Sequence, residues 1–211
     1  MSLSKHELFQ QMLEQINLHH QPEYLPYFEN GEIEQVIVHK KSKLWSFQFV
    51  FDNVLPFEVF TALMNHMKIK FQSIATIDFQ IKTRKPILTN ESILDYWETV
   101  VQRSNISSPL VLSLFAKHTP VVLDNKVVIS VENEITKNHL ADNYLSIIQQ
   151  NYLVLGFPSF QITIEVDEAA SEARMAQYLA RKQEQDEMLV KQAEEAIKQN
   201  QQDRQRSDGS Q

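Results

Sequence analysis

The sequence contains no cysteine and only three glycines, and both shortages exclude whole classes of site. Without cysteine there can be no disulfide, thiolate zinc site, iron–sulfur cluster or cysteine nucleophile. Gly31, Gly156 and Gly209 lie far apart in the chain. Loops that hold phosphate groups need clustered glycines, because backbone amides must approach the ligand closely. The sequence therefore excludes a Walker loop, a dinucleotide-binding fingerprint and a nucleophile elbow.

The chain has neither a net positive charge nor a long apolar run. The formal net charge is −7 at pH 7, whereas proteins that bind by neutralising phosphates usually carry a basic surface. No run approaches the roughly 18 apolar residues that cross a bilayer, and the first residues lack the apolar core of a signal peptide. Together with the absence of cysteine, these features predict a soluble, cytoplasmic protein that has no membrane partner.

Two stretches of the chain share a strand–helix–strand pattern. The first has alternating apolar residues from Trp45 to Phe51, then an amphipathic helix, then alternation from Ala75 to Ile81. The second begins at Val127, continues through a helix and alternates again from Phe160 onward. A period of two predicts strands with one buried face. We therefore predict an α+β fold with two small β-α-β-containing units.

Local signals predict where the helices begin. Ser4 opens a capping box, and Pro56 suits the first residue of a helix because its missing N–H would be unpaired there. Asn90 is the expected cap of a third helix. Asn133 is the expected cap of a single long helix that reaches about Leu153.

Changes in composition divide the chain into three expected parts. The first unit covers residues 1–84 and ends in a polar segment before Pro86. The second covers residues 85–167. Residues 168–211 are charged, rich in glutamine and poor in aromatics, which predicts a helical arm with little buried surface. Because such an arm usually connects domains, we expect these residues to be part of a longer chain.

Two basic segments, which we expect to form one basic neighbourhood, are the candidate contacts for nucleic acid. They comprise Lys40, Lys41, Lys43, Lys82, Arg84 and Lys85. One interpretation is contact with phosphates. The other is a solvated hairpin tip whose lysines discourage edge-to-edge strand pairing.

The aromatic strand from Trp45 to Phe51 also has two interpretations. Aromatic side chains on a sheet can stack on nucleic-acid bases. Such platforms interleave aromatic residues with basic ones, however, and the opposite face here, Leu44, Ser46, Gln48 and Val50, has no positive charge. This favours packing in a core.

No grouping of residues predicts catalysis. The seven histidines have no zinc-site spacing, and the acidic pairs lie where they stabilise helix ends. No serine, histidine and aspartate grouping has a local signature. We therefore predict no catalytic, cofactor-binding or metal-binding residue, and no cofactor, in this segment.

Several stretches in order resemble one family. The Asn30–Gly31 turn followed by Lys43–Phe47 resembles the first N-terminal domain of PolC-type replicative DNA polymerases, the bacterial polymerase III α subunits that carry their own proofreading domain. Val131–His139 is similar to the matching segment of that family's second N-terminal domain. Gly156, Phe157 and the glutamine-rich arm fit the same region, so the resemblance covers essentially the whole chain.

The resemblance implies a fold and a role. The first domain would be similar to the polymerase-binding domain of the clamp-loader tau subunit, and the second to a type II KH fold. In this family an OB-fold, a histidinol-phosphatase-like module, a 3′-5′ exonuclease and the polymerase follow the arm, with all the catalytic carboxylates and metals. The chain departs from the KH pattern because it lacks a Gly-x-x-Gly loop, which favours protein contacts over the usual KH grip on nucleic acid.

We therefore expect a non-catalytic interaction region that docks the polymerase to replisome proteins during chromosomal DNA replication. The clamp-loader tau subunit is a candidate partner, and DNA would be bound by the rest of the parent polymerase. The alternative is an auxiliary single-stranded nucleic-acid-binding module that uses the basic segments. An enzyme active within these residues would need a site assembled from scattered side chains.

Overall fold

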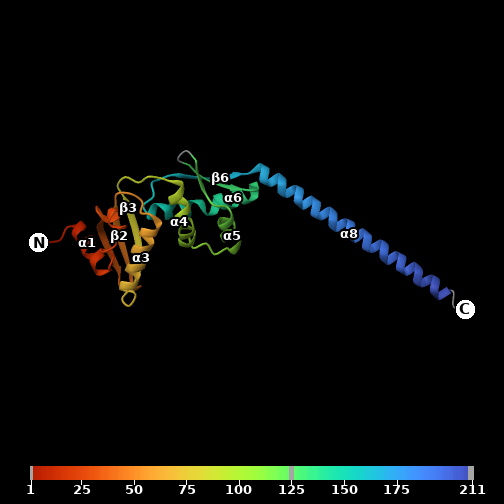
Figure 1. The fold of residues 1–211 in the computed structure, drawn as a ribbon, viewed down its shortest axis with the longest axis horizontal. Coiled ribbons are helices and arrows are strands. Elements are labelled where there is room, and N and C mark those ends of the chain that lie inside the picture. The colour runs from red at the N-terminus through yellow and green to blue at the C-terminus, as the bar shows by residue number, and fades with distance from the viewer. Residues whose placement is uncertain (1, 124–125, 209–211) are drawn as a thin grey trace. The chain divides into compact units, whose positions relative to one another are not determined.

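In the computed structural model, which describes residues 2–123 and 126–208, two three-stranded sheets occupy successive parts of the chain (Figure 1). The first module, residues 5–83, contains α1 (Lys5–Gln15), α2 (Leu25–Phe28), β1 (Glu32–His39), β2 (Leu44–Phe51), α3 (Phe57–Phe71) and β3 (Thr76–Thr83). The second module, residues 90–166, contains α4 (Asn90–Arg103), α5 (Pro109–Lys117), β4 (Val121–Leu123), β5 (Lys126–Val131), α6 (Glu134–Asn143), α7 (Leu145–Val154) and β6 (Gln161–Val166). The predicted α+β class is confirmed.

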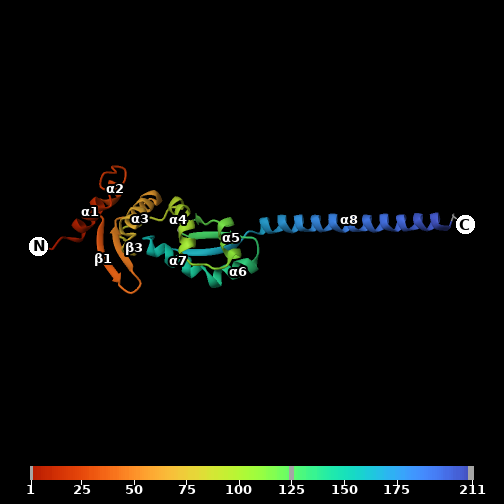
Figure 2. The ribbon, with the colours of Figure 1, turned by 90° about the horizontal axis from the view of Figure 1, so that it is seen from below.

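The sheet of the first module contains the expected β-α-β unit. β1 runs antiparallel to β2, and β2 runs parallel to β3, so α3 is the crossover between parallel strands (Figure 2). Trp45 pairs with Ile77 and Phe49 with Ile81, which places these side chains on the same face. The alternation seen in the sequence therefore corresponds to one core face and one polar face. On the polar face, the Gln48 amide donates to Gln80 at 3.0 Å.

Aromatic rings form the core of the first module. Phe9 of α1 meets Phe28, Phe49 and Phe51 edge-on, with ring centroids 5.7, 5.9 and 5.5 Å apart. Such edge-to-face pairs add to the gain from burying apolar area. Phe47, Phe49 and Phe51 are buried. The interpretation of this strand as a core strand is confirmed.

Ion pairs connect the strand ends opposite the β1–β2 turn. Arg84 lies within 3.1 Å of Glu32 and 2.9 Å of Asp52, and it also donates to the Asn30 carbonyl. The Asn30 amide and the Arg84 guanidinium hold the pKa of the Asp52 carboxyl below its usual value. This end of the sheet is therefore an acidic and basic network whose charges largely offset one another.

Strands β4, β5 and β6 are neighbours in that order in the second module. Two buried hydrogen bonds hold its helices. The indole of Trp97 donates to the Phe115 carbonyl at 2.9 Å, and the hydroxyl of Tyr152 donates to the Ile93 carbonyl at 2.8 Å. Both large side chains thus bury an apolar body and satisfy their one polar group.

Two predicted helix starts are wrong by one residue. Thr89, not Asn90, caps α4, because its hydroxyl accepts a hydrogen bond from the Ser92 amide. The Asn90 side chain instead accepts from the Val122 amide of β4. Pro56 is the cap of α3 and has extended backbone angles, so the helix begins at Phe57.

The predicted helix from Asn133 to Leu153 is also wrong in one respect, because it is broken at Tyr144. The cap is correct, since the Asn133 side chain accepts from the Thr136 amide at 2.8 Å. At the other end of α6, the Asn143 side chain donates to the His139 carbonyl at 2.8 Å. This local bond gives a helix carbonyl an alternative partner and favours an end there.

Tyr96 of α4 connects the two modules. Its ring lies 5.0 Å from Phe57 and 5.2 Å from Phe60 of α3, and 5.0 Å from Phe157. Its hydroxyl donates to the carbonyl of Leu55 at 2.8 Å. The aromatic core of one module thus continues into that of the other without a solvent gap at this residue.

A second contact between the modules depends on Gly156. Its φ is +93°, and its carbonyl accepts a hydrogen bond from the Thr83 hydroxyl at 2.5 Å. A Cβ at this position would lie 2.9 Å from the methyl groups of Ile81 and Thr83. Only glycine suits both the backbone conformation and the close approach.

α8 (Glu168–Asp208) belongs to a separate unit, because the chain divides between Glu165 and Val166 into two separately packed parts. Figure 1 shows α8 as one uninterrupted helix. Its described apolar side chains, including Leu179, Leu189 and Ile197, are exposed. The helix therefore depends on propensity rather than on packing within its own unit.

The Tyr96 junction predicts how the modules unfold. Trp45 reports on the first module and Trp97 on the second, so single-tryptophan variants can follow each in urea by fluorescence. We expect one shared midpoint in the parent protein. Tyr96→Ala should lower the free energy of unfolding by about 3–5 kcal/mol and separate the two midpoints. Tyr152→Phe removes a buried tyrosine hydrogen bond inside the second module, so it should lower the two unfolding midpoints together. Coincident midpoints in Tyr96→Ala would contradict the coupling of the modules.

Gly156→Ala should destabilise the same junction. Strain from the positive φ and the close methyl groups predicts a loss of about 1–3 kcal/mol in the free energy of unfolding. Thr83→Ser keeps the hydroxyl but removes one of the two methyl groups. The double variant Gly156→Ala/Thr83→Ser should therefore regain part of the loss in urea denaturation. An unchanged free energy of unfolding in Gly156→Ala would show that the contact does not stabilise the junction.

The Asp52 network predicts acid sensitivity. A carboxyl whose pKa is lowered in the folded state stabilises the protein above its unfolded pKa of about 3.9, and this stability is lost as pH falls through the folded value. The unfolding free energy of Asp52→Asn should therefore change less steeply than that of the parent protein between about pH 5 and pH 2. The control is Asp142→Asn, which removes the same charge from an exposed part of α6 outside the network; an equally reduced slope in this variant would contradict the role of the Asp52 network.

Candidate interaction surface

The described residues contain no group of three histidine, cysteine, aspartate or glutamate side chains that could hold a metal ion. The two most strongly perturbed groups are tyrosines with structural roles. Burial raises the pKa of Tyr96 and Tyr152, and both hydroxyls donate to backbone carbonyls. These perturbed groups therefore mark packing and hydrogen bonding rather than chemistry.

The six basic residues singled out in the sequence lie in two separate places. Lys40, Lys41 and Lys43 lie in the turn between β1 and β2. Parallel pairing aligns Leu44 with Thr76 at one end of the sheet and Phe51 with Thr83 at the other. The segment from Lys82 to Lys85 therefore lies about 20 Å from the turn, at some 3.3 Å per residue of strand. The six residues do not form one basic neighbourhood.

The segment at the far end is engaged with acids. Lys82 lies 2.7 Å from Glu34, and Arg84 pairs with Glu32 and Asp52. The hydrogen bond from Lys82 lowers the pKa of Glu34. The amide of Lys85 donates to the Asp52 carbonyl, and its side chain is exposed. Two of these three basic side chains are therefore already paired.

The turn between β1 and β2 is different, because no ion pair involves its lysines in the described part of the chain. All three lysines are exposed. The structure also brings Lys68 and Lys70, in the last turn of α3, to this end. The Phe71 ring lies 5.5 Å from Trp45, and the Lys43 carbonyl accepts from the Thr76 amide at 2.8 Å. We call this surface, with Lys40, Lys41, Lys43, Lys68 and Lys70, the lysine end.

Sequence reasoning missed Lys68 and Lys70 as members of this surface. The parallel β2–β3 register is what returns the end of α3 to the turn. The available signal was the β-α-β pattern itself, since a helix between parallel strands ends where the second strand begins.

Aliphatic side chains are exposed at the lysine end. Val36 and Val38 of β1 pair with Phe47 and Trp45, so they lie on the core side of the sheet. They are nevertheless 40% and 46% exposed. Ile69 and Ile74, at the end of α3 and in the turn that follows, are also exposed. The surface therefore combines positive charge with apolar area.

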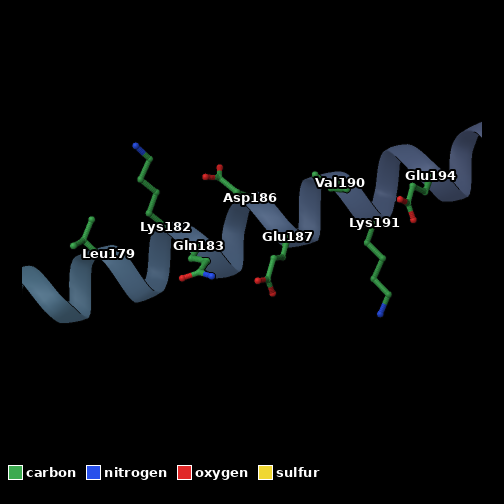
Figure 3. Close-up of a pocket in the computed structure, with 8 residues that line it drawn as sticks. All are labelled: Leu179, Lys182, Gln183, Asp186, Glu187, Val190, Lys191 and Glu194. Carbon is green, nitrogen blue, oxygen red and sulfur yellow. The ribbon is translucent and has the colours of Figure 1, made fainter.

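Two other hollows are less suited to a specific ligand. A cleft of about 390 Å³ between α4 and α5 is lined mainly by apolar side chains, among them Trp97, Val101 and Leu112. Along α8, all the residues around the hollow in Figure 3 belong to the one helix, from Leu179 to Glu194. Lys182 and Asp186 extend from one side and Glu187 and Lys191 from another, so no opposing wall encloses a ligand.

None of the described helices is both long enough and apolar enough to pass through a bilayer.

Comparison with known proteins places the chain in a family. The family model described as DNA polymerase III polC-type N-terminus I matches residues 8–81, and the model described as N-terminus II matches residues 95–210. No solved structure matches the chain.

Curated relatives are named DNA polymerase III PolC-type. The protein of Latilactobacillus sakei is 44% identical over 172 residues, which cover 82% of this chain and 12% of the relative. That of Lacticaseibacillus paracasei is 31% identical over 94% of this chain and 14% of the relative. That of Bacillus subtilis is 31% identical over 75% of this chain and 11% of the relative. The chain thus spans only a small part of these relatives' length, and it belongs to the PolC-type DNA polymerase III family, whose N-terminal domains I and II it contains.

Proposed function

We propose that this chain is the docking region of a bacterial PolC-type replicative polymerase, and that it binds replisome proteins through the lysine end. One observation supports this most. The lysine end carries positive charge that no ion pair between described residues engages, beside exposed aliphatic side chains, in a chain whose net charge is −7. Exposed apolar area bordered by charge is typical of protein-binding surfaces.

The junction at Tyr96 supports a positioning role. Because the aromatic contacts and the buried hydrogen bond connect the modules, a partner held at the lysine end would have a fixed orientation relative to the second module. A docking region that connects a polymerase to other proteins benefits from such rigidity, since less freedom is lost on binding.

The segment itself is proposed to be non-catalytic. DNA-directed synthesis, with 3′-5′ exonuclease activity, would belong to other parts of the parent protein, which would act in the bacterial cytoplasm. The similarity of the first module to the tau polymerase-binding domain, and of the second to a type II KH fold, is part of this proposal. No glycine occurs between Gly31 and Gly156, so no Gly-x-x-Gly loop is available in the second module before Gly156.

Calorimetric titration tests the docking role. The chain, titrated in separate cells with the clamp-loader tau subunit and with single-stranded DNA, should release or absorb heat with the tau subunit at micromolar concentrations. A silent titration with the tau subunit, and with the other replisome proteins in turn, would contradict the proposal.

The second candidate function is an auxiliary single-stranded nucleic-acid-binding module. The five lysines at one end of the first module are the observation in its favour. Binding to phosphates should weaken steeply as salt rises, because each neutralised phosphate releases counterions. Heat with DNA alone, abolished by Lys40→Glu, Lys41→Glu and Lys43→Glu together, would favour this function over protein docking.

A further inference from the structure

We infer that the lysine end binds an acidic protein segment rich in aliphatic residues, which lies along the exposed edge of β1. This inference rests on the docking role proposed above and specifies the chemistry of the partner. It follows from the distribution of charge in the first module, from the exposed valines and from the position of β1 in its sheet.

Charge is distributed unevenly between the two ends of the first module, which the net charge of the chain does not show. Three of its acidic residues, Glu32, Glu34 and Asp52, lie at the end away from the β1–β2 turn, where they are paired with Lys82 and Arg84. Asp78, the acid nearest the turn in β3, lies on the other face of the sheet and is paired with Arg103. No ion pair among the described residues engages the lysines at the turn, so their positive charge complements an acidic ligand.

Strand β1 is an edge strand of the described sheet, with β2 as its neighbour. Its register shifts between Ile33 and Gln35, so the regular part of the edge runs from Gln35 to His39 beside the lysines. Edge strands can accept an additional strand, whose backbone supplies hydrogen bonds and whose alternate side chains meet the exposed face. Val36 and Val38 would then meet aliphatic side chains of the partner.

The same lysines that discourage pairing with ordinary edges favour an acidic one. A positively charged or neutral strand that approaches β1 has no electrostatic attraction to the turn. Its binding would also remove water from Lys40, Lys41 and Lys43 without compensation. An acidic strand gains electrostatic attraction there, which also speeds association. The protective and the binding interpretations of these lysines are thus compatible, and the charge of the incoming strand decides between them.

A protein segment fits this surface better than a nucleic acid does. Single-stranded nucleic acids bind through aromatic side chains on which bases stack. The exposed apolar groups here are valine and isoleucine, while Trp45 is partly buried and its ring centroid lies 5.5 Å from that of Phe71. The cations are lysines, which do not recognise phosphate bidentately as arginine does.

Fluorescence anisotropy on the whole chain with labelled probes tests the inference. The probes are a short peptide that alternates glutamate with valine, a peptide of equal charge that alternates glutamate with serine, and oligothymidylate. We expect the glutamate–valine peptide to bind most tightly. Lys40→Glu/Lys41→Glu/Lys43→Glu should weaken it by about tenfold or more. Val38→Thr should weaken it by about threefold, from the lost apolar contact.

Matched variants control for overall charge and for edge valines in general. Lys182→Glu/Lys191→Glu/Lys198→Glu makes the same change of charge on exposed positions of α8 and should leave affinity within about twofold. Val121→Thr changes a valine of β4 that is 46% exposed, the same fraction as Val38, and should have no effect. Circular dichroism of each variant confirms that its helices and strands are intact.

Several results of these binding measurements would overturn the inference. The inference is overturned by equal affinity for the valine and serine peptides, by tighter binding of oligothymidylate, by no binding of either peptide, or by equal loss in the α8 control. Titration of the triple lysine variant with the tau subunit separates this inference from the docking role. If the triple lysine variant binds the tau subunit as tightly as the parent protein does, the docking role stands but the lysine end is not the docking site.

Discussion

The structure of residues 2–165 depends on a buried tyrosine whose ring and hydroxyl serve different modules at once. Tyr96 belongs to α4, yet its hydroxyl donates to Leu55 and its ring meets Phe57 and Phe60 of the first module. On its other side it contacts Phe157, which in turn meets Tyr152. Each three-stranded sheet alone has a small core, and small cores supply little net stability. The shared aromatic row gives both modules a larger common core, and it fixes the surface of one relative to the other.

The second constraint is the parallel pairing of β2 and β3. A crossover helix between parallel strands must return to the end of the sheet at which the first strand began. This brings the last turn of α3, with Lys68 and Lys70, to the β1–β2 turn, and it carries Lys82 and Arg84 to the acids at the opposite end. The result is a module with paired charges at one end and, at the other, exposed valines beside lysines that form no ion pair with any residue the structure describes. A protein with a net charge of −7 can therefore present a local positive surface to an acidic partner.

Periodicity predicted most of the elements, because alternation from Trp45 to Phe51 and the apolar stripe of α3 report directly on burial. The errors came where several local partners compete. Thr89 and Asn90 are both able to cap α4, and only the proximity of β4 gives Asn90 another role, with the Val122 amide. At the break at Tyr144, the Asn143 side chain donates to the His139 carbonyl, which a regular helix would also use. The membership of the lysine end was not predictable from charge alone, because it follows from strand register rather than from neighbours in sequence.

Through the contacts of Tyr96 and Gly156, we expect the two modules to move as one rigid body that holds the lysine end at a fixed position. Nuclear magnetic relaxation of backbone amides in the whole chain tests this most directly, because it gives the tumbling time of each module separately. We expect the same tumbling time for amides in β1–β3 and in β4–β6. Two clearly different times, with the shorter one in the first module, would show that the contacts of Tyr96 and Gly156 do not hold the modules together.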